Sequence, residues 1–272
     1  MTSLDAGALA EFDAERRFGG LRRLWGAEAY ARVRAARIGV VGIGGVGSWA
    51  VEALARCGVA ELVLFDLDHV AESNINRQIQ ALGSTLGAAK VEAMAARVRD
   101  IHPGCRLSLV DDFVDADNWP ALLPAPVDVL IDACDQGRAK QAMARWALRE
   151  RQAVVVVGAA GGKSRAHAVE VADLAEVSHD PMLARLRQQL RRDQRDGLLP
   201  PPVAGRKGQP VPFGLSCVFS RESVHRPEEG CAVDGSLNCA GYGSSVMVTA
   251  SFGMAAAAQA LAMVRDCNVA KV

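Results

Sequence analysis

Residues 40–49 read Val-Val-Gly-Ile-Gly-Gly-Val-Gly-Ser-Trp (VVGIGGVGSW), and this stretch decides the fold. Gly42, Gly44 and Gly47 match the pattern GxGxxG, between an apolar run at 38–41 and a helical pattern at 48–57. Glycines allow the tight turn and the close approach of backbone to a phosphate, and the following helix N-terminus favours an anion. Asp66 ends the next apolar run, at the place where an acid can bind ribose hydroxyls. The stretch therefore predicts a nucleotide-binding turn and leaves the nucleotide open.

Working outward, apolar runs alternate with helical patterns as far as residue 165. The runs are typical of strands buried on both faces, so we predict a doubly wound, Rossmann-like α/β fold with a mostly parallel sheet and helices on both faces. The strands are expected at 38–41, 61–65, 106–110, 127–132 and 153–158, and the helices at 48–57, 90–101 and 138–151. The chain divides into an N-terminal helical arm (1–35), a nucleotide-binding core (36–165), a substrate-facing insertion (166–243) with a mobile loop (198–212), and a C-terminal helix (244–272).

Composition excludes several classes of protein. The 272 residues carry 31 basic and 31 acidic side chains, so a nucleic-acid partner would need a local basic patch. The seven cysteines include no CxxC pair, which argues against zinc and favours a reducing cytoplasm. The N-terminus has no apolar region typical of a secretory signal. Residues 244–264 are apolar over the length of a membrane span but rich in small residues, so we expect a buried helix there.

Charged residues beyond the glycines favour ATP over NAD. Arg77 and Lys90 follow the second strand, and Asp135 follows the fourth. A nicotinamide site gains little from two cations, whereas a triphosphate gains from an arginine fork and a lysine point charge. A carboxylate beyond the fourth strand can hold Mg²⁺ against the phosphates. We therefore expect a site for ATP and Mg²⁺, and an NAD-dependent dehydrogenase is the less favoured alternative.

Several motifs together resemble the ThiF/HesA/MoeB family of ubiquitin-activating-like adenylating enzymes. They are GIGGVGS (42–48), FDLD (65–68), SNINRQ (73–78), AAKVEAM (88–94) and DACDQGRAK (132–140). The resemblance implies an adenylation domain whose nucleotide-binding residues are Gly42, Gly44, Gly45, Gly47, Asp66, Asp68, Asn74, Arg77, Gln78 and Lys90. It implies catalytic roles for Arg77, Lys90 and Asp135, with Asp135 on Mg²⁺, and for Arg17, which would reach the partner subunit of a homodimer. Asp68 could help organise Mg²⁺ or the nucleotide, or could equally form an ion pair with an arginine, and Asp132 is left without a role.

Other motifs resemble one branch of that family, which dehydrates N6-threonylcarbamoyladenosine beside the tRNA anticodon. They are RFGG (17–20), LWG (24–26), DDF (111–113), CVFS (217–220) and NCAGYG (238–243). The branch implies ATP-dependent cyclisation through an acyl-adenylate, with tRNA as substrate and a cysteine-desulfurase or sulfur-acceptor system as a possible partner. Members that activate sulfur carriers usually have two CxxC pairs, which this chain lacks, and Gln136 stands where Asn is common.

Further candidate residues are a cysteine thiol and four cations. Cys239 lies in a glycine-rich segment and is a possible catalytic thiol, although a structural cysteine is the more common case. Lys163, Arg187, Arg191 and Arg192 are possible tRNA contacts, and a solvated surface helix is the equal alternative for the arginines. Besides tRNA dehydration, the sequence is compatible with an adenylating enzyme for a ubiquitin-like sulfur carrier and with a non-catalytic nucleotide-binding scaffold.

Overall fold

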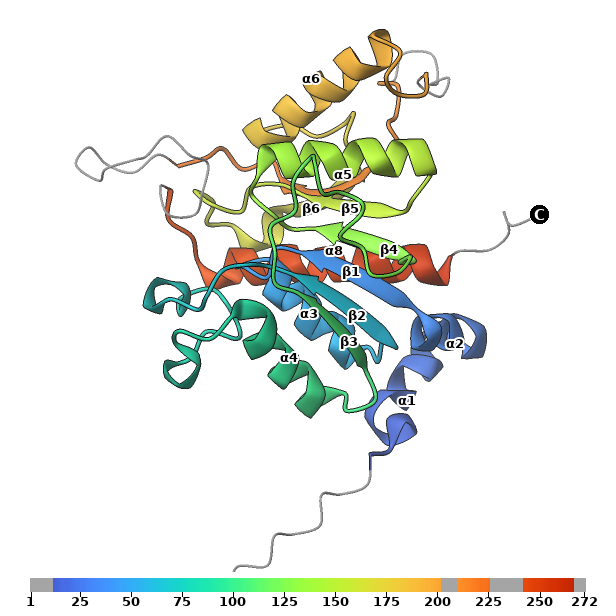
Figure 1. Ribbon diagram of the computed structural model, residues 1–272, viewed down its shortest axis with the longest axis vertical. Helices are drawn as coiled ribbons and strands as arrows, with labels where there is room; N and C mark the ends of the chain where they lie inside the picture. Colours follow the sequence, from blue (N-terminus) through green and yellow to red (C-terminus); the bar gives the residue numbers. More distant parts are fainter. Residues whose placement is uncertain (1–11, 202–209, 226–241, 267–272) are drawn as a thin grey trace, which may run out of the picture.

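The computed structural model describes residues 12–201, 210–225 and 242–266. Figure 1 shows one twisted sheet flanked by helices. The helices are α1 (Ala14–Trp25), α2 (Ala27–Ala35), α3 (Gly47–Arg56), α4 (Lys90–Ile101), α5 (Gly137–Glu150), α6 (Pro181–Arg195) and α8 (Val246–Arg265). The strands are β1 (Arg37–Val41), β2 (Glu61–Phe65), β3 (Arg106–Val110), β4 (Val129–Asp132), β5 (Val154–Val157), β6 (Val169–Asp173) and β7 (Ser216–Ser220). Short 3-10 turns are η1 (Glu72–Asn74), η2 (Gly83–Thr85) and η3 (Ala166–Ala168).

The sheet has seven strands in the order β3-β2-β1-β4-β5-β7-β6. All neighbouring pairs are parallel except β6, which is antiparallel to β7. The predicted doubly wound, mostly parallel fold is confirmed. The strand order reverses direction between β1 and β4, and in such sheets ligands bind beyond the carboxyl ends of the strands at this point. The glycine turn follows β1 and therefore lies at the reversal.

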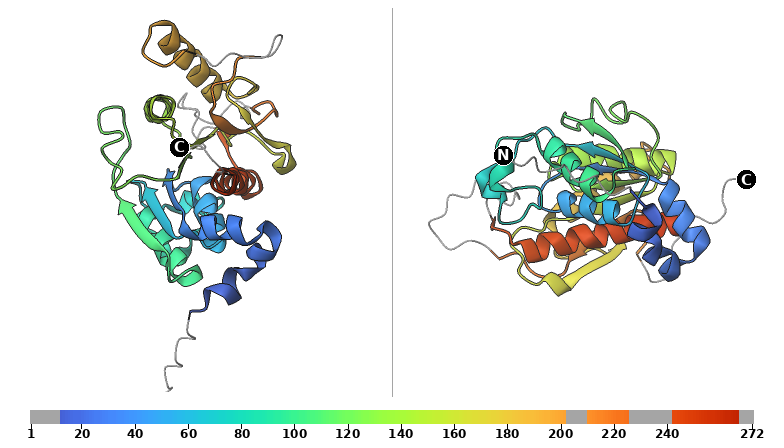
Figure 2. Two further views of the ribbon diagram at one scale, coloured as in Figure 1. Left: turned by 90° about the vertical axis from the view of Figure 1, so that its right-hand side faces the viewer. Right: turned by 90° about the horizontal axis from the view of Figure 1, so that it is seen from below.

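Side chains of the central strands are buried on both faces of the sheet. Val40 and Leu64 pack in one core with α3, α4 and α8, whereas Val41 and Phe65 pack in a second core with α5 and α6. Figure 2 (left) shows α5 and α8 on opposite sides of the sheet. Both strand positions are apolar because neither face meets water, which explains the continuous apolar runs.

The C-terminal helix α8 packs across α3 and against β4, β5, β6 and β7. Its length and composition would allow it to cross a membrane, which is weak evidence because buried helices pass the same test. Gly253 brings the two helices close: a Cβ there would lie 2.7 Å from Cβ of Trp49 and 3.0 Å from the backbone nitrogen of Ala50. Small residues thus allow α8 to lie directly on the helix that follows the glycine turn.

The N-terminal helices attach to the far end of α4. Asp13 caps α1 by accepting a hydrogen bond from the backbone nitrogen of Arg16 at 3.1 Å. The ring of Phe18 packs against that of His102, with centroids 4.8 Å apart. Burial, with help from Arg34 and Arg17, lowers the pKa of His102 to about 4. Because Arg34 can only donate, the contact of 2.9 Å from its Nη1 to Nε2 of His102 requires a neutral ring.

Residues 166–243, expected as a substrate-facing insertion, contribute β6, α6 and β7 to the far edge of the sheet. Their role toward a substrate stays a prediction. Residues 202–209 of the expected mobile loop, and Cys239, lie outside the described residues.

Candidate functional site

The glycine turn joins β1 to α3 and gives the site its floor. Gly42 has a φ of +86°, and its backbone nitrogen donates to the carbonyl of Phe65 at 2.9 Å. A Cβ on Gly47 would overlap the carbonyl oxygen of Gly42, so no larger residue fits without moving the turn. Gly45 lies under Arg77: a Cβ there would be 3.5 Å from Cγ and Cδ of that arginine. The turn is therefore tight, and it leads directly into the N-terminus of α3, the end of a helix that favours an anion.

A cavity of about 420 Å³ opens above this turn, at the carboxyl ends of β1, β2, β4 and β5. It gathers nearly all the predicted nucleotide-binding residues, although they come from separate parts of the chain. The lining includes Gly42, Gly44, Gly45, Asp66, Asp68, Asn74, Arg77, Gln78, Lys90, Asp112, Phe113, Asp135, Gln136, Ala159, Gly161, Met182 and Thr249. Gly47 lies just behind, at the start of α3.

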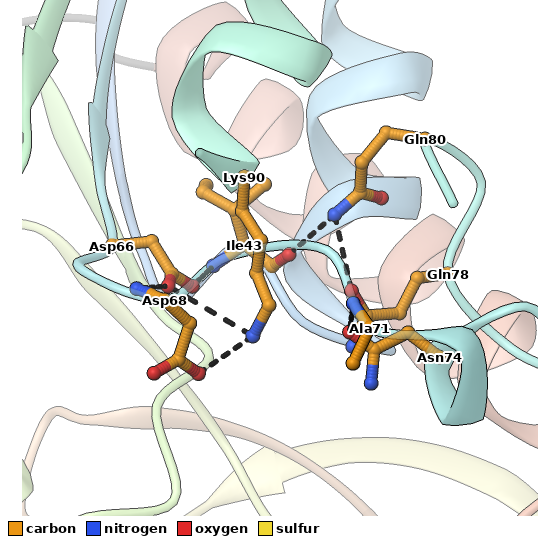
Figure 3. A network of polar contacts seen from close by, with 8 residues as sticks. All are labelled: Ile43, Asp66, Asp68, Ala71, Asn74, Gln78, Gln80 and Lys90. Atoms are coloured by element: carbon orange, nitrogen blue, oxygen red, sulfur yellow. Dashed lines mark hydrogen bonds and ion pairs between the residues drawn. The ribbon is translucent and has the colours of Figure 1, made fainter. Parts of the chain in front are cut away.

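Two carboxylates at the end of β2 hold Lys90 (Figure 3). Its ammonium nitrogen Nζ lies 2.6 Å from Oδ2 of Asp68 and 3.9 Å from Oδ1 of Asp66. Asp66 also accepts hydrogen bonds from the backbone nitrogens of Ile43, at 2.6 Å, and of Asp68, at 2.9 Å. Burial raises the pKa of Asp66, and the nearby Lys90 opposes that shift. Asp68 thus forms an ion pair, with Lys90 rather than with an arginine.

Amide side chains brace the segment after β2, on the other side of Lys90 in Figure 3. Asn74 is buried, and its Oδ1 accepts from the backbone nitrogen of Ala71 at 3.1 Å. The buried Gln80 donates to the carbonyl of Ile43 at 2.8 Å and to Oε1 of Gln78 at 3.1 Å. These bonds fix residues 74–80 against the glycine turn. Gln80 is not among the predicted residues, because the motif SNINRQ ends at Gln78.

Arg77 lies at the surface of the cavity with its backbone anchored from two helices. Its carbonyl accepts from Nε1 of Trp49 on α3 at 2.9 Å and from Oγ1 of Thr249 on α8 at 3.3 Å. Its Nη1 donates to the carbonyl of Ser73 at 2.6 Å and to Oδ1 of Asn76 at 2.9 Å. Among the described residues no hydrogen bond or ion pair uses the other guanidinium nitrogens of Arg77, which lines the cavity.

The turn after β4 joins an exposed carboxylate to a buried ion pair. Asp135 is exposed and lines the cavity. Behind it, Nζ of Lys140 lies 2.8 Å from Oδ1 of Asp132, and the two side chains are 1% and 0% exposed. Oδ1 of Asp132 also accepts from Sγ of Cys134 at 3.0 Å. Gln136 stands at the N-cap of α5 without a side-chain capping bond, which an Asn could form.

Helix α6 begins at the same cavity. Asp180 caps it by accepting from the backbone nitrogen of Leu183 at 3.0 Å, and its other oxygen accepts from the backbone nitrogen of Ala159 at 2.8 Å. A Cβ on Gly158 would overlap that carboxylate. Asp180 therefore joins α6 to the turn after β5, which lines the cavity. Asp180 is not among the residues that the sequence analysis predicts for the site.

Lys163 corrects an expectation. It is 4% exposed, and its Nζ donates to the carbonyls of Ser220, at 3.0 Å, and Glu222, at 2.8 Å. Burial lowers the pKa of this lysine. Its ammonium cannot reach a partner at the surface without leaving these bonds, so Lys163 serves the fold rather than tRNA binding.

Arg17 is also engaged elsewhere. Its Nη1 donates to the carbonyls of Asp100, at 2.9 Å, and Ile101, at 2.6 Å, at the C-terminal end of α4. Arg17 is not among the residues that line the cavity. Within one subunit Nη1 of Arg17 therefore caps α4, and its role at a partner's site stays a prediction.

The family model described as the ThiF family matches residues 19–272. The chain belongs to the ThiF family. The tRNA threonylcarbamoyladenosine dehydratase of Haemophilus influenzae is 40% identical over 250 residues, which make up 91% of this chain and 92% of that protein. The enzyme of the same name from Escherichia coli is 42% identical over 256 residues, covering 90% and 92%. The crystal structure of the E. coli dehydratase in complex with ATP superposes with a TM-score of 0.79 and 40% identity, covering 92% of this chain and 94% of that one.

These likenesses extend over nearly the whole of this ThiF-family chain and of each relative. They therefore include the helices and strands beyond residue 165, and not only the nucleotide-binding half. The resemblance predicted from the motifs is confirmed at the level of the family and its fold.

Proposed function

We propose that this chain is an ATP-dependent dehydratase that cyclises N6-threonylcarbamoyladenosine in tRNA. The observation that carries the proposal is the combination of near end-to-end likeness to dehydratases of that name with a cavity that gathers Arg77, Lys90 and Asp135. An NAD-dependent dehydrogenase fits this cavity poorly, because two cations stand where a triphosphate needs them.

Each residue at the cavity has a proposed task. The turn from Gly42 to Gly47 carries the phosphates, and Asp66 accepts hydrogen bonds from the ribose hydroxyls. Lys90 and Arg77 neutralise the phosphate chain, and binding lets Lys90 exchange part of its contact with Asp68 for a phosphate oxygen. Asn74 and Gln78 hold the segment that presents Arg77.

Magnesium fits the donors present. Asp135 offers one exposed carboxylate at the cavity, and Mg²⁺ usually combines one or two carboxylates with waters and substrate phosphates. When bound, the ion would neutralise charge on the phosphates. The described residues contain no cluster of three or more His, Cys, Asp or Glu side chains that could hold a metal by itself. We expect waters and the phosphates to supply the remaining ligands.

The proposed reaction has two steps. The carboxylate of the threonylcarbamoyl group attacks the α-phosphorus of ATP, forming an acyl-adenylate and releasing pyrophosphate. A carbamoyl atom of the same group then attacks the acyl carbon and expels AMP while the carbamoyl group loses a proton, which closes a five-membered ring. The net change is loss of one water from the nucleoside. The protein's contribution is to align the carboxylate and to stabilise charge on the phosphates.

Other parts of the proposal concern the surroundings. A homodimer would let Arg17 or the adjacent Arg16 approach a partner's cavity; Arg16 is exposed, and only its backbone is used in the cap of α1. We also propose a sulfur-transfer partner, a site without zinc and a cytoplasmic location.

The deciding experiment is mass spectrometry of nucleosides from tRNA carrying threonylcarbamoyladenosine, after incubation with the protein, ATP and Mg²⁺. We expect a product lighter by one water. Arg77→Ala should abolish the product, whereas Arg99→Ala, at an exposed site on α4, should not. Pyrophosphate exchange stimulated by a carrier protein ending in Gly-Gly, and not by the modified tRNA, would refute the proposal in favour of sulfur-carrier activation. Normal product from Arg77→Ala would refute the assignment of the site.

A further inference from the structure

Helix α6 carries an exposed stripe of basic and polar side chains that leads away from the cavity. The stripe consists of Arg185, Gln188, Arg192 and Arg195, all of them exposed. Their spacing of three, four and three residues places them on one face of a helix. The opposite face is buried through Leu183, Leu186 and Leu190.

The remaining charges of α6 contact other parts of the protein, although Arg191 is also exposed. Arg187 donates to the carbonyls of Val177, at 2.6 Å, and Leu174, at 3.2 Å. The guanidinium of Arg191 lies 5.8 Å from the ring centroid of Phe213. Asp193 is buried and accepts two bonds from Arg145 at 2.7 Å. By contrast, within the described part of the chain the guanidinium groups of the stripe form no ion pair or hydrogen bond.

The stripe is held rigidly with respect to the cavity. At one end of α6, Asp180 binds the backbone of Ala159 beside the cavity. Near the other end, the ion pair of Asp193 and Arg145 fixes the helix to α5, which packs beside it in Figure 1. Two anchors, one near each end, keep the positions of the stripe fixed as a ligand enters.

The stripe also begins at the cavity. Met182 lines the cavity, and at a rise of about 1.5 Å per residue Arg185 lies about 4.5 Å further along the helix axis, Arg192 about 15 Å and Arg195 about 20 Å. A macromolecule with one reacting group in the cavity would therefore extend along this face. Because the chain as a whole has no net charge, such a local row of cations needs a specific reason.

We propose that this stripe binds the backbone phosphates of the tRNA strand that leads from the reacting nucleotide. The inference rests on the proposed function and adds the place and direction of the tRNA. Arginine forks suit phosphate oxygens, and phosphate contacts set the register of a nucleic acid without reading its sequence. Asp196 at the C-cap of α6 is the exposed acid next to the stripe, and it marks the end of the row. Of the arginines that the sequence predicts as tRNA contacts, Arg192 belongs to the stripe, Arg187 donates to backbone carbonyls, and Arg191, although exposed, lies over the ring of Phe213.

The test compares tRNA binding by the full-length protein and by the triple variant Arg185→Gln/Arg192→Gln/Arg195→Gln. Glutamine keeps a good helix propensity, so the thermal midpoint should stay the same. Each phosphate contact contributes about 0.7 to 0.9 to the slope of log K against log salt, so the slope should fall by about 2 to 3. At 0.15 M salt the affinity for tRNA should fall roughly 100-fold. Binding of ATP should not change.

Single variants sharpen the result. Arg192→Gln should lower the salt slope by about 1, and Arg99→Gln, which removes the same charge from α4, should leave it unchanged. An unchanged affinity for tRNA and an unchanged salt slope in the triple variant would refute the proposed role of the stripe, even if the unaltered protein dehydrates tRNA. Stripe-dependent binding of tRNA without any dehydration would support the stripe and refute the proposed function.

Discussion

The buried ion pair of Lys140 and Asp132 gives the sharpest test of how the site is supported. Lys140 reaches from α5 to the end of β4, directly behind the turn that carries Asp135. Both side chains are enclosed, and Nζ lies 2.8 Å from Oδ1 of the carboxylate. Asp132 raises the pKa of Lys140 against the effect of burial, so the lysine stays charged. The perturbation is Lys140→Met, which keeps the length of the side chain and removes the charge.

The expected loss is large because one charge remains behind. Breaking a buried ion pair by removing one partner typically costs about 3–5 kcal/mol, since the other charge is left uncompensated. No other cation lies within ion-pair distance of Asp132 among the described residues, and its Oδ2 has no hydrogen-bond partner there. We therefore expect a loss near the top of this range and a thermal midpoint lower by roughly 10 °C.

The assay is urea denaturation of the unaltered protein, the single variant and Lys140→Met/Asp132→Asn. The double variant has no unpaired charge, so it should regain at least about 2 kcal/mol of the loss. If stability is restored while dehydratase activity stays low, the pair also positions the turn that holds Asp135. A loss below about 1 kcal/mol in Lys140→Met, with no recovery in the double variant, would refute the reasoning.

Three further predictions concern the glycine turn, the phosphate lysine and the N-terminal arm. In Gly47→Ala the new methyl group overlaps the carbonyl of Gly42, so ATP affinity by calorimetry should fall at least about 100-fold; a change within twofold would contradict this. Lys90→Ala should lower the rate of adenylate formation about 100- to 1,000-fold in pyrophosphate exchange, while Asp68→Ala should affect it far less. His102 has a folded pKa of about 4 against 6.5 when unfolded, so unfolding takes up a proton in this window and stability falls as pH drops from 6.5 to 4. The loss should total about 3 kcal/mol and be missing in His102→Gln; equal pH dependence of the two proteins would count against neutral burial.

The alternating half of the fold could be predicted in detail from the sequence. Strands buried on both faces leave continuous apolar runs, and glycine or proline ends the helices between them, so β2 and α4 begin and end where expected. Strand β6 could not be predicted in this way, whereas β7 is a buried apolar run that the same reasoning could have found. β6 is an edge strand whose residues are half-buried or exposed, and its five residues do not form an apolar run. Its place depends on pairing with β7, which lies far along the chain, since β6 ends at Asp173 and β7 begins at Ser216.

For the site, sequence motifs identify the residues expected to contact the nucleotide, but not the residues that hold these in position. Arg77 and Asp135 stand out because charged residues in the segments that follow buried strands indicate a ligand site. Lys140 and Gln80 look like ordinary surface residues, and only the structure shows them buried. Lys163 and Arg187 show the converse error, because a long cationic side chain can turn inward to backbone carbonyls. The sequence shows how many cations lie on α6, and only the structure shows which of them contact other parts of the protein.

The close contact of Gly253 with α3 has a consequence for biosynthesis. Helix α8 is the last described helix of the chain, yet it covers the helix that carries the glycine turn and holds the carbonyl of Arg77 through Thr249. During translation from the N-terminus, the strands around the cavity leave the ribosome well before α8 does. We expect the apolar face of α3 to stay uncovered until then, and nascent chains stalled before residue 246 to bind chaperones rather than ATP.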